Sequence, residues 1–165
     1  MRKRYRKETK KMAGTMDILI REMTIEDYPQ VYRLWTEIQG FGIRSVDDSR
    51  EGVERFLKRN PGISVVAVQN GRIVGTILCG HDGRQASFYH VCVAASYRKH
   101  GVGHRMAKFC IKALHEEGVS KVSLVAFKKN AVGNAFWQDG GWTLREDFNC
   151  YEFLLNEENV THFIQ

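Results

Sequence analysis

The sequence predicts a single α+β domain, and three features of its pattern support this class. In several short segments apolar and polar residues alternate, as in half-buried strands. In other segments apolar residues recur every three or four positions, as on one face of a helix. The changes between the two periods fall at turn signals such as Asn70-Gly71 and Asp82-Gly83. The length of 165 residues is enough for one well-buried core.

The elements are expected in the order β-α-α-β-β-β-α-β-α-β-β. Strand patterns occupy residues 18–22, 64–68, 73–79, 86–94, 121–127, 142–145 and 151–155. Helical patterns occupy residues 24–40, 49–59, 101–117 and 130–139. Residues 41–47 are expected to form a loop. Thr24 and Asp27 have the spacing of a capping box, and Gly118 follows the longest helical pattern, where a glycine often ends a helix.

The net charge of +6 is concentrated at the start of the chain. Residues 1–15 hold seven Lys or Arg and one Glu, so residues 16–165 carry no net charge. We expect residues 1–15 to be a basic, disordered tail and residues 16–165 to form the single domain. The tail is interpreted as a mis-assigned start or a dispensable extension, and contact with nucleic acid or the ribosome is the alternative. The neutral domain itself is not expected to bind nucleic acid.

Four cysteines lie inside apolar stretches and form no Cys-x-x-Cys pair: Cys79, Cys92, Cys110 and Cys150. We interpret them as reduced core thiols of a cytoplasmic protein. No apolar run approaches the roughly 18 residues of a membrane span, and no secretory signal is expected. A metal site is not expected either, because His100 and His104 have no carboxylate near them in the sequence.

The segment at residues 97–106, YRKHGVGHRM, is where we expect the function to lie. A strand pattern changes there to a helical one, and glycines let a ligand approach the backbone closely. The first N–H groups of a helix have no partner within it and carry partial positive charge, to which Arg98 and Lys99 add. The segment therefore predicts an anion site of the kind that holds pyrophosphate. It matches neither a Walker loop nor a Rossmann fingerprint, because Met106 stands at the third glycine position.

The pattern that remains, Arg-x-x-Gly-x-Gly, is part of a longer resemblance. The stretch VCVAASYRKHGVG precedes an amphipathic helix, a strand pattern and the motif Asn-x6-Trp-x3-Gly-Trp, which begins at Asn130. With this order over residues 17–155, the sequence resembles the GNAT superfamily of acetyl-CoA-dependent N-acetyltransferases. The resemblance implies a mixed, mostly antiparallel sheet flanked by helices. The DGRQ turn at residues 82–85 and the Phe136-Trp137 pair resemble its YpeA-like bacterial branch.

The resemblance implies that acetyl-CoA is the co-substrate, and it assigns binding residues in three groups. One group matches a strand that pairs its backbone with the pantetheine arm, as in β-augmentation. The second matches the pyrophosphate loop, and the third lies on the following helix near the arm. The implied set is Val91, Cys92, Val93, Arg98, Lys99, His100, Gly101, Val102, Gly103, His104, Asn130, Asn134 and Trp137.

The implied reaction is direct attack of a neutral primary amine on the thioester. Many members of the family place a tyrosine where this chain has Trp137, and indole cannot donate a proton near neutral pH. The catalytic candidates therefore stay open as His90, Tyr151 and Ser87, the last at the place of a glutamate base in some relatives. If side chains alternate between the two faces of the strand, His90 shares a face with Phe88. We interpret His90 either as a structural residue or as the general base. A relay of water molecules could also take the proton of the amine, with no dedicated base.

The acceptor is expected to lie between the first two helical patterns and the last strands. Candidate lining residues are Trp35, Phe41, Arg44 and Arg84. Trp35 also fits the apolar stripe of its helix. Asp47-Asp48 fits a solvated helix start as well as an amine clamp. The acceptor is a small molecule, a peptide N-terminus or a lysine.

Two other functions stay open. The chain could bind acyl-CoA as a regulatory module without turnover, which the tryptophan at position 137 would suit. It could also act through its basic tail as a nucleic-acid- or ribosome-associated protein, and the salt dependence of binding would show this. A homodimer is a candidate assembly.

Overall fold

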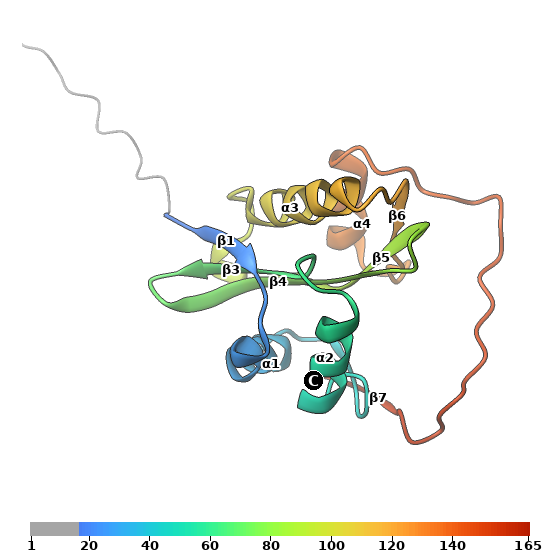
Figure 1. Ribbon diagram of the computed structural model, residues 1–165, viewed down its shortest axis with the longest axis horizontal. Helices are drawn as coiled ribbons and strands as arrows, with labels where there is room; N and C mark the ends of the chain where they lie inside the picture. The colour runs from blue at the N-terminus through green and yellow to red at the C-terminus, as the bar shows by residue number, and fades with distance from the viewer. Residues whose placement is uncertain (1–16) are drawn as a thin grey trace, which may run out of the picture.

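A five-stranded sheet runs through the centre of the domain in the order β1-β3-β4-β5-β6 (Figure 1). The computed structural model describes residues 17–165, so the basic tail and Met16 lie outside the described part. The strands are β1 (Leu19–Glu22), β3 (Val65–Gln69), β4 (Arg72–His81), β5 (Gln85–Val93) and β6 (Lys121–Ser123). Neighbouring strands are antiparallel except β5 and β6, which are parallel. The predicted α+β class with a mixed, mostly antiparallel sheet is confirmed.

Helices cover both faces of this sheet. They are α1 (Tyr28–Thr36), α2 (Arg50–Arg59), α3 (Val102–Glu116) and α4 (Ala131–Asp139), with 3-10 turns at Ile25–Asp27 and Ala95–Tyr97. Figure 1 shows α1 and α2 on one face and α3 on the other. Each face has its own apolar core, with Trp35 on the α1 side and Met106 on the α3 side, both fully buried. Within residues 17–165 no helix is long and apolar enough to cross a membrane.

The starts of the first two helical segments follow from local side-chain chemistry. Thr24 and Asp27 form the predicted capping box, in which the Thr24 N–H donates to Asp27 Oδ2 at 2.9 Å. The Ser49 hydroxyl accepts the Gly52 N–H at 3.0 Å and caps α2. These contacts fix where the 3-10 turn before α1 begins and where α2 begins.

A β-bulge interrupts β5 and changes which side chains share a face. Thr76 pairs with Cys92, while Leu78 pairs with Tyr89, so two residues of β5 oppose Ile77 alone. Tyr89 contacts Phe56 of α2 and His90 contacts Trp35 of α1, whereas Phe88 belongs to the core under α3. The expectation that His90 and Phe88 share a face is therefore wrong. The bulge adds a residue, and every position after it changes face.

The strands β5 and β6 stay together only over their first three residues. Their paired positions run from Gln85 with Lys121 to Ser87 with Ser123. Beyond Ser87, the edge of β5 that faces β6 has no strand partner within the described residues. The second half of β5, residues 88–93, therefore offers free backbone groups along one edge.

The C-terminal part departs from the predicted element order. Residues 142–145 and 151–155, expected as strands, have no strand partner, and β6 ends at Ser123 instead of residue 127. The final strand is β7 (Thr161–Phe163), which pairs with β2 (Gly42–Arg44) inside the segment predicted as a loop. Alternation is not sufficient for a strand, because a strand also needs a free neighbouring edge. Figure 1 shows the chain after α4 running away from the sheet and returning beside α2.

Candidate functional site

The start of α3 offers backbone donors without helical partners. Gly101 is the N-cap, with a left-handed φ of 76°, and no side chain of the described residues caps the helix. The first bond of the helix runs from the Arg105 N–H to the Gly101 carbonyl at 3.0 Å. The N–H groups of Val102, Gly103 and His104 therefore have no acceptor within the helix. With the partial positive charge of the helix start, they form the arrangement that an anion needs.

The loop before α3 adds positive charge and an open surface. Arg98, Lys99 and His100 are exposed. Arg98 donates from Nε to the Val93 carbonyl at 2.9 Å, which ties the loop to the end of β5. A side chain on Gly101 would meet nothing within 4 Å, so a ligand can approach the backbone there.

Gly103 serves the packing of α4 on α3. A Cβ at this position would lie 2.9 Å from Cζ of the Phe136 ring, which is too close for any real contact. His104 stacks on the same ring, with 4.4 Å between centroids. The sequence suggested that both glycines expose backbone to a ligand, and the structure shows this open surface at Gly101 alone of the two.

The open edge of β5 lies directly before this loop in the chain. Val91 and Val93 pack toward α3, and Cys92 packs toward α1. The Cys92 Sγ lies 3.3 Å from the Thr76 hydroxyl, and burial raises the pKa of the thiol to about 11, so it stays protonated at neutral pH. The backbone edge, and not this thiol, is what a ligand with amide groups can use.

Aromatic side chains of α4 and its following turn pack on β5. The Trp137 ring centroid lies 6.3 Å from that of Phe88 and 4.8 Å from that of Trp142. Trp142 also contacts Phe88, at 5.5 Å between centroids. Trp137 therefore packs beside the second half of β5.

The two asparagines of α4 organise the start of that helix. Asn130 is its N-cap, and its Oδ1 accepts the Gly133 N–H at 3.0 Å. Asn134 donates from Nδ2 to the carbonyls of Phe127 and Asn130, at 2.9 and 2.8 Å. Both amides thus hold the segment between β6 and α4 in place.

The three catalytic candidates lie in different surroundings. His90 lies in the bulge of β5, with its ring centroid 4.5 Å from Trp35 and 4.9 Å from Phe41. Ser87 lies on the same strand, at the last position paired with β6. Tyr151 is 88% exposed in the extended segment after α4, so the structure does not bring it to β5.

The acceptor candidates divide into a group near the bulge and one distant residue. Trp35 contacts His90 but is fully buried, so it is a core residue that cannot touch an acceptor. Phe41 is partly exposed beside the same ring, and Arg44 is exposed at the end of β2. Arg84 precedes β5 at its other end, and six residues of strand place it about 20 Å from His90.

Asp48 is the residue whose place the sequence could not determine. It is 4% exposed, and its Oδ1 lies 2.6 Å from His90 Nε2. Its Oδ2 accepts the Arg44 N–H at 2.7 Å. The two side chains come from positions 42 residues apart, so no local pattern in the sequence could have paired them.

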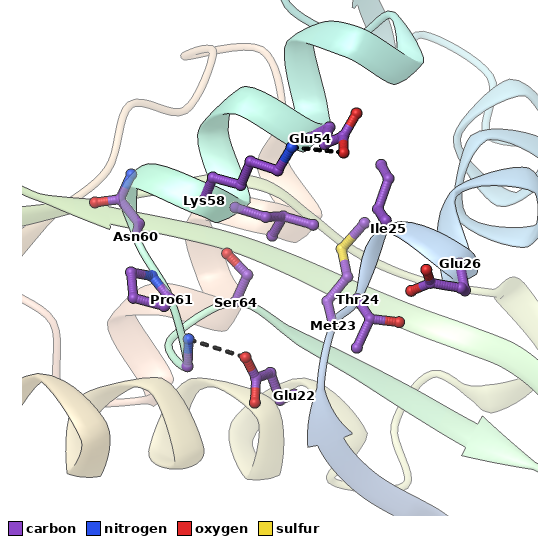
Figure 2. A pocket seen from close by; sticks show the side chains of 12 residues that line it. Glu22, Met23, Thr24, Ile25, Glu26, Glu54, Lys58, Asn60, Pro61 and Ser64 are labelled. Carbon is purple, nitrogen blue, oxygen red and sulfur yellow. Dashed lines mark hydrogen bonds and ion pairs between the residues drawn. The ribbon is translucent and has the colours of Figure 1, made fainter.

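A pocket of about 230 Å³ lies elsewhere, between the end of β1 and α2 (Figure 2). Its polar side chains pair with their neighbours: Lys58 with Glu54 at 2.8 Å, and Glu22 with the Gly62 N–H at 3.0 Å. None of the residues that line it belongs to β5, to α4 or to the loop before α3. We therefore assign this pocket no part in the candidate site.

Comparisons with known proteins agree with this geometry. A family model described as the acetyltransferase (GNAT) family matches residues 21–142. Acetyltransferase ECA0875 of Pectobacterium atrosepticum is 30% identical over 111 residues, which cover 67% of this chain and 77% of that protein. Both matches include β5 and the glycine loop only as parts of a longer alignment, so the likeness extends over most of the domain.

Solved structures show the same fold. The PaiA N-acetyltransferase of Thermoplasma acidophilum, in complex with coenzyme A, has a TM-score of 0.69 at 15% identity, over 88% of this chain and 97% of that one. A ribosomal-protein-alanine N-acetyltransferase of Brucella melitensis has a TM-score of 0.65 at 17% identity, over 84% and 99%. The family match and the sequence relative establish more than the fold. This chain belongs to the GNAT family of acetyltransferases, enzymes that use acetyl-CoA.

Proposed function

We propose that the chain transfers the acetyl group of acetyl-CoA to a primary amine by direct attack of the amine on the thioester. The acceptor is a small molecule, a peptide N-terminus or a lysine. One observation carries the proposal: the open edge of β5 continues directly into the uncapped start of α3. A ligand with an amide-bearing arm and a pyrophosphate fits both features at once.

Each part of acetyl-CoA has a counterpart in this arrangement. The backbone of residues 91–93 receives the pantetheine arm, and residues 98–104 receive the pyrophosphate, with the charges of Arg98 and Lys99 nearby. Trp137 packs beside the arm, and Asn130 and Asn134 hold the start of α4. Acetyl-CoA supplies the activated thioester, while these residues position it at the end of β5.

Three finer assignments belong to the same proposal. We place the chain in the YpeA-like bacterial branch of the family, on the DGRQ turn and the Phe136-Trp137 pair. We place it in the cytoplasm, which the four free cysteines support; Cys79, Cys92 and Cys110 are buried, whereas Cys150 is exposed and is not the core thiol that the sequence suggested. The domain is proposed to act without the basic tail.

We also propose a homodimer. The support is a series of exposed apolar side chains after α4, which a second copy of the chain would cover: Leu144, Phe148, Tyr151, Phe153, Leu154 and Leu155. Light scattering on the protein as it elutes from a size-exclusion column measures the mass of the assembly directly. A monomer at micromolar concentration would contradict this assembly and leave the enzymatic proposal unchanged.

Calorimetric titration with acetyl-CoA and, separately, with NAD tests the proposed cofactor site. We expect binding of acetyl-CoA and none of NAD. A panel of amines is then assayed for release of the coenzyme A thiol. Binding without thiol release for any amine would favour the regulatory module, and failure to bind acetyl-CoA would contradict the proposed function.

The alternative that uses the basic tail is tested by comparing the full chain with one that begins at Met16. Both are expected to bind acetyl-CoA equally. Salt-sensitive binding of nucleic acid by the full chain alone would assign a separate role to residues 1–15.

A further inference from the structure

His90 and Asp48 form a short contact between two titratable side chains inside the domain. His90 Nε2 and Asp48 Oδ1 are 2.6 Å apart, and the side chains are 16% and 5% exposed. A distance this short is typical of a charge-assisted hydrogen bond. Burying such groups is costly, so a pair of this kind calls for an explanation beyond packing.

The carboxylate of Asp48 is fixed from several directions. Its Oδ2 accepts the Arg44 N–H at 2.7 Å, and its backbone carbonyl accepts the Tyr28 hydroxyl at 2.8 Å. The imidazole of His90 packs against the rings of both Trp35 and Phe41. Neither member of the pair can rotate without breaking these contacts.

The contact determines which nitrogen of His90 is free. The carboxylate is an acceptor, so Nε2 carries the hydrogen and Nδ1 keeps its lone pair. Among the described residues, no protein group forms a hydrogen bond with Nδ1. Every buried side-chain nitrogen or oxygen of these residues has a hydrogen-bond partner, so Nδ1, which has none, must reach the solvent. Nδ1 is therefore accessible and able to accept a proton. This is the arrangement in which a carboxylate orients a histidine base.

The backbone at His90 aims the ring. Its φ of 50° lies in the left-handed region, which is uncommon for a residue other than glycine. Together with the bulge, this turns the ring toward α1, one residue before the segment that would hold the pantetheine arm. Strained residues and bulges of this kind concentrate at functional sites.

We infer that His90 is the general base of the acetyl transfer and that Asp48 is the positioning residue that fixes its tautomer. This inference rests on the proposed function. The ammonium of the acceptor gives one proton to Nδ1 and becomes a neutral amine. Its nitrogen bonds to the thioester carbon while the carbon–sulfur bond breaks. The leaving thiolate takes the second amine proton, and His90 releases its proton to water.

Other titratable groups around the pair cannot replace His90. Burial raises the pKa of Tyr28 to about 12 and that of Cys92 to about 11, so both stay protonated. Asp47 is exposed, and its carboxylate lies 3.4 Å from Arg44 and 3.9 Å from Arg55, facing these cations. Imidazole is also the side-chain group that proteins use most often as a general base.

The tautomer is measured in the unmutated full chain. Nitrogen-15 chemical shifts of the imidazoles report which ring nitrogen is protonated, and His90→Asn assigns the signal, because asparagine tolerates the left-handed backbone. We expect the hydrogen on Nε2, which faces the Asp48 carboxylate. Hydrogen on Nδ1 would overturn the inference, and this result does not depend on any enzymatic assay.

Kinetics then separate the base from a structural role. We expect His90→Asn to lower kcat about 100-fold or more without changing the affinity for acetyl-CoA. We expect Asp48→Asn to lower kcat and to move the acidic limb of the pH profile to lower pH, because the imidazolium loses its carboxylate. The matched controls are His115→Gln and Asp147→Asn, both exposed, which should leave kcat and the profile unchanged.

Failure of the inference and failure of the proposed function look different. Turnover by the wild type that persists undiminished in His90→Asn would overturn the base and leave the acetyltransferase. No turnover by the wild type with any amine would overturn the proposed function and the base with it. An Asp48→Asn profile that coincides with that of the wild type would remove the positioning role of Asp48.

Discussion

The carboxylate of Asp27 shows how one side chain links the pH to the stability of this domain. Burial raises the pKa of Asp27, but hydrogen bonds from Arg21 and from the Thr24 N–H outweigh burial and hold it below its usual range. Arg21 reaches both carboxylate oxygens at 2.7 Å. A lowered pKa contributes stability above the unfolded value, near 4, and this contribution is lost as the pH falls through the folded value.

We therefore expect Arg21→Gln to lower the free energy of unfolding by about 1–2 kcal/mol at pH 7, because it leaves a largely buried carboxylate without its main partner. The difference from the wild type should shrink as the pH falls below about 4, because Asp27 becomes protonated first in the unfolded chain and, at lower pH, also in the folded one. Urea denaturation at several pH values measures both. Arg145→Gln, in an exposed pair with Asp147, is the control and should have no such effect. An equal loss of unfolding free energy at every pH would contradict the assignment of the effect to the Asp27 carboxylate.

The sequence identified single residues well where their role is local. Gly101 caps α3 in the left-handed region, and Thr24 forms its capping box, because both depend on neighbours within four positions. The contact between Asp48 and His90 could not be predicted. It depends on a bulge and on a loop between two helices, and neither leaves a mark in the local pattern.

At the level of elements, the junction of α3 and α4 depends on the absence of a side chain at Gly103. The Phe136 ring occupies the space that a Cβ would need. We expect Gly103→Ala to lower the free energy of unfolding by about 1–3 kcal/mol, because an overpacked contact forces α4 away from α3. Urea denaturation, followed by the fluorescence of Trp137 and Trp142, reports both the stability and the displacement.

A double-mutant cycle isolates this contact. In a Phe136→Leu background the smaller side chain leaves room for the methyl group, so Gly103→Ala should cost clearly less than in the wild type. Gly101→Ala is the comparison at the same helix start. It meets no atom within 4 Å and is opposed only by its left-handed backbone, so Phe136→Leu should not change its cost. Equal costs of Gly103→Ala in both backgrounds would contradict the packing role.

Whole elements were predictable where each has its own period and its own partner. The helices and the strands of the central sheet were expected within a few residues of their bounds, because alternating or helical spacing decides them. Residues 142–145 and 151–155 also alternate, yet they pair with no strand among the described residues, although Trp142 packs on Phe88 of β5. The pairing of β2 with β7 joins segments more than a hundred residues apart, so no local signal indicates it.

At the scale of the whole molecule, the end of the chain holds the loop that carries Asp48. β7 pairs with β2, and Asn159 completes the junction just before it. The Asn159 Oδ1 accepts the N–H groups of Val46 and Asp47, at 3.1 and 3.2 Å, and its Nδ2 donates to the Asp47 carboxylate at 2.7 Å. Asp48, the proposed partner of His90, directly follows Asp47. The contacts of the C-terminal segment therefore help to position the residues of the proposed reaction site.

Removing the Asn159 contacts should therefore alter catalysis from a distance. We expect Asn159→Ala to lower kcat on the order of tenfold, since a small displacement of Asp48 misplaces the His90 ring, and to move the acidic limb of the pH profile as Asp48→Asn does. The affinity for acetyl-CoA should stay the same, because the open edge of β5 and the start of α3 contact none of these atoms. Asn156→Ala is the matched control, as the Asn156 side chain only accepts the nearby Glu158 N–H. If both variants kept the wild-type kcat and pH profile, the Asn159 contacts would not be needed to hold Asp48 in place, and the prediction would be wrong.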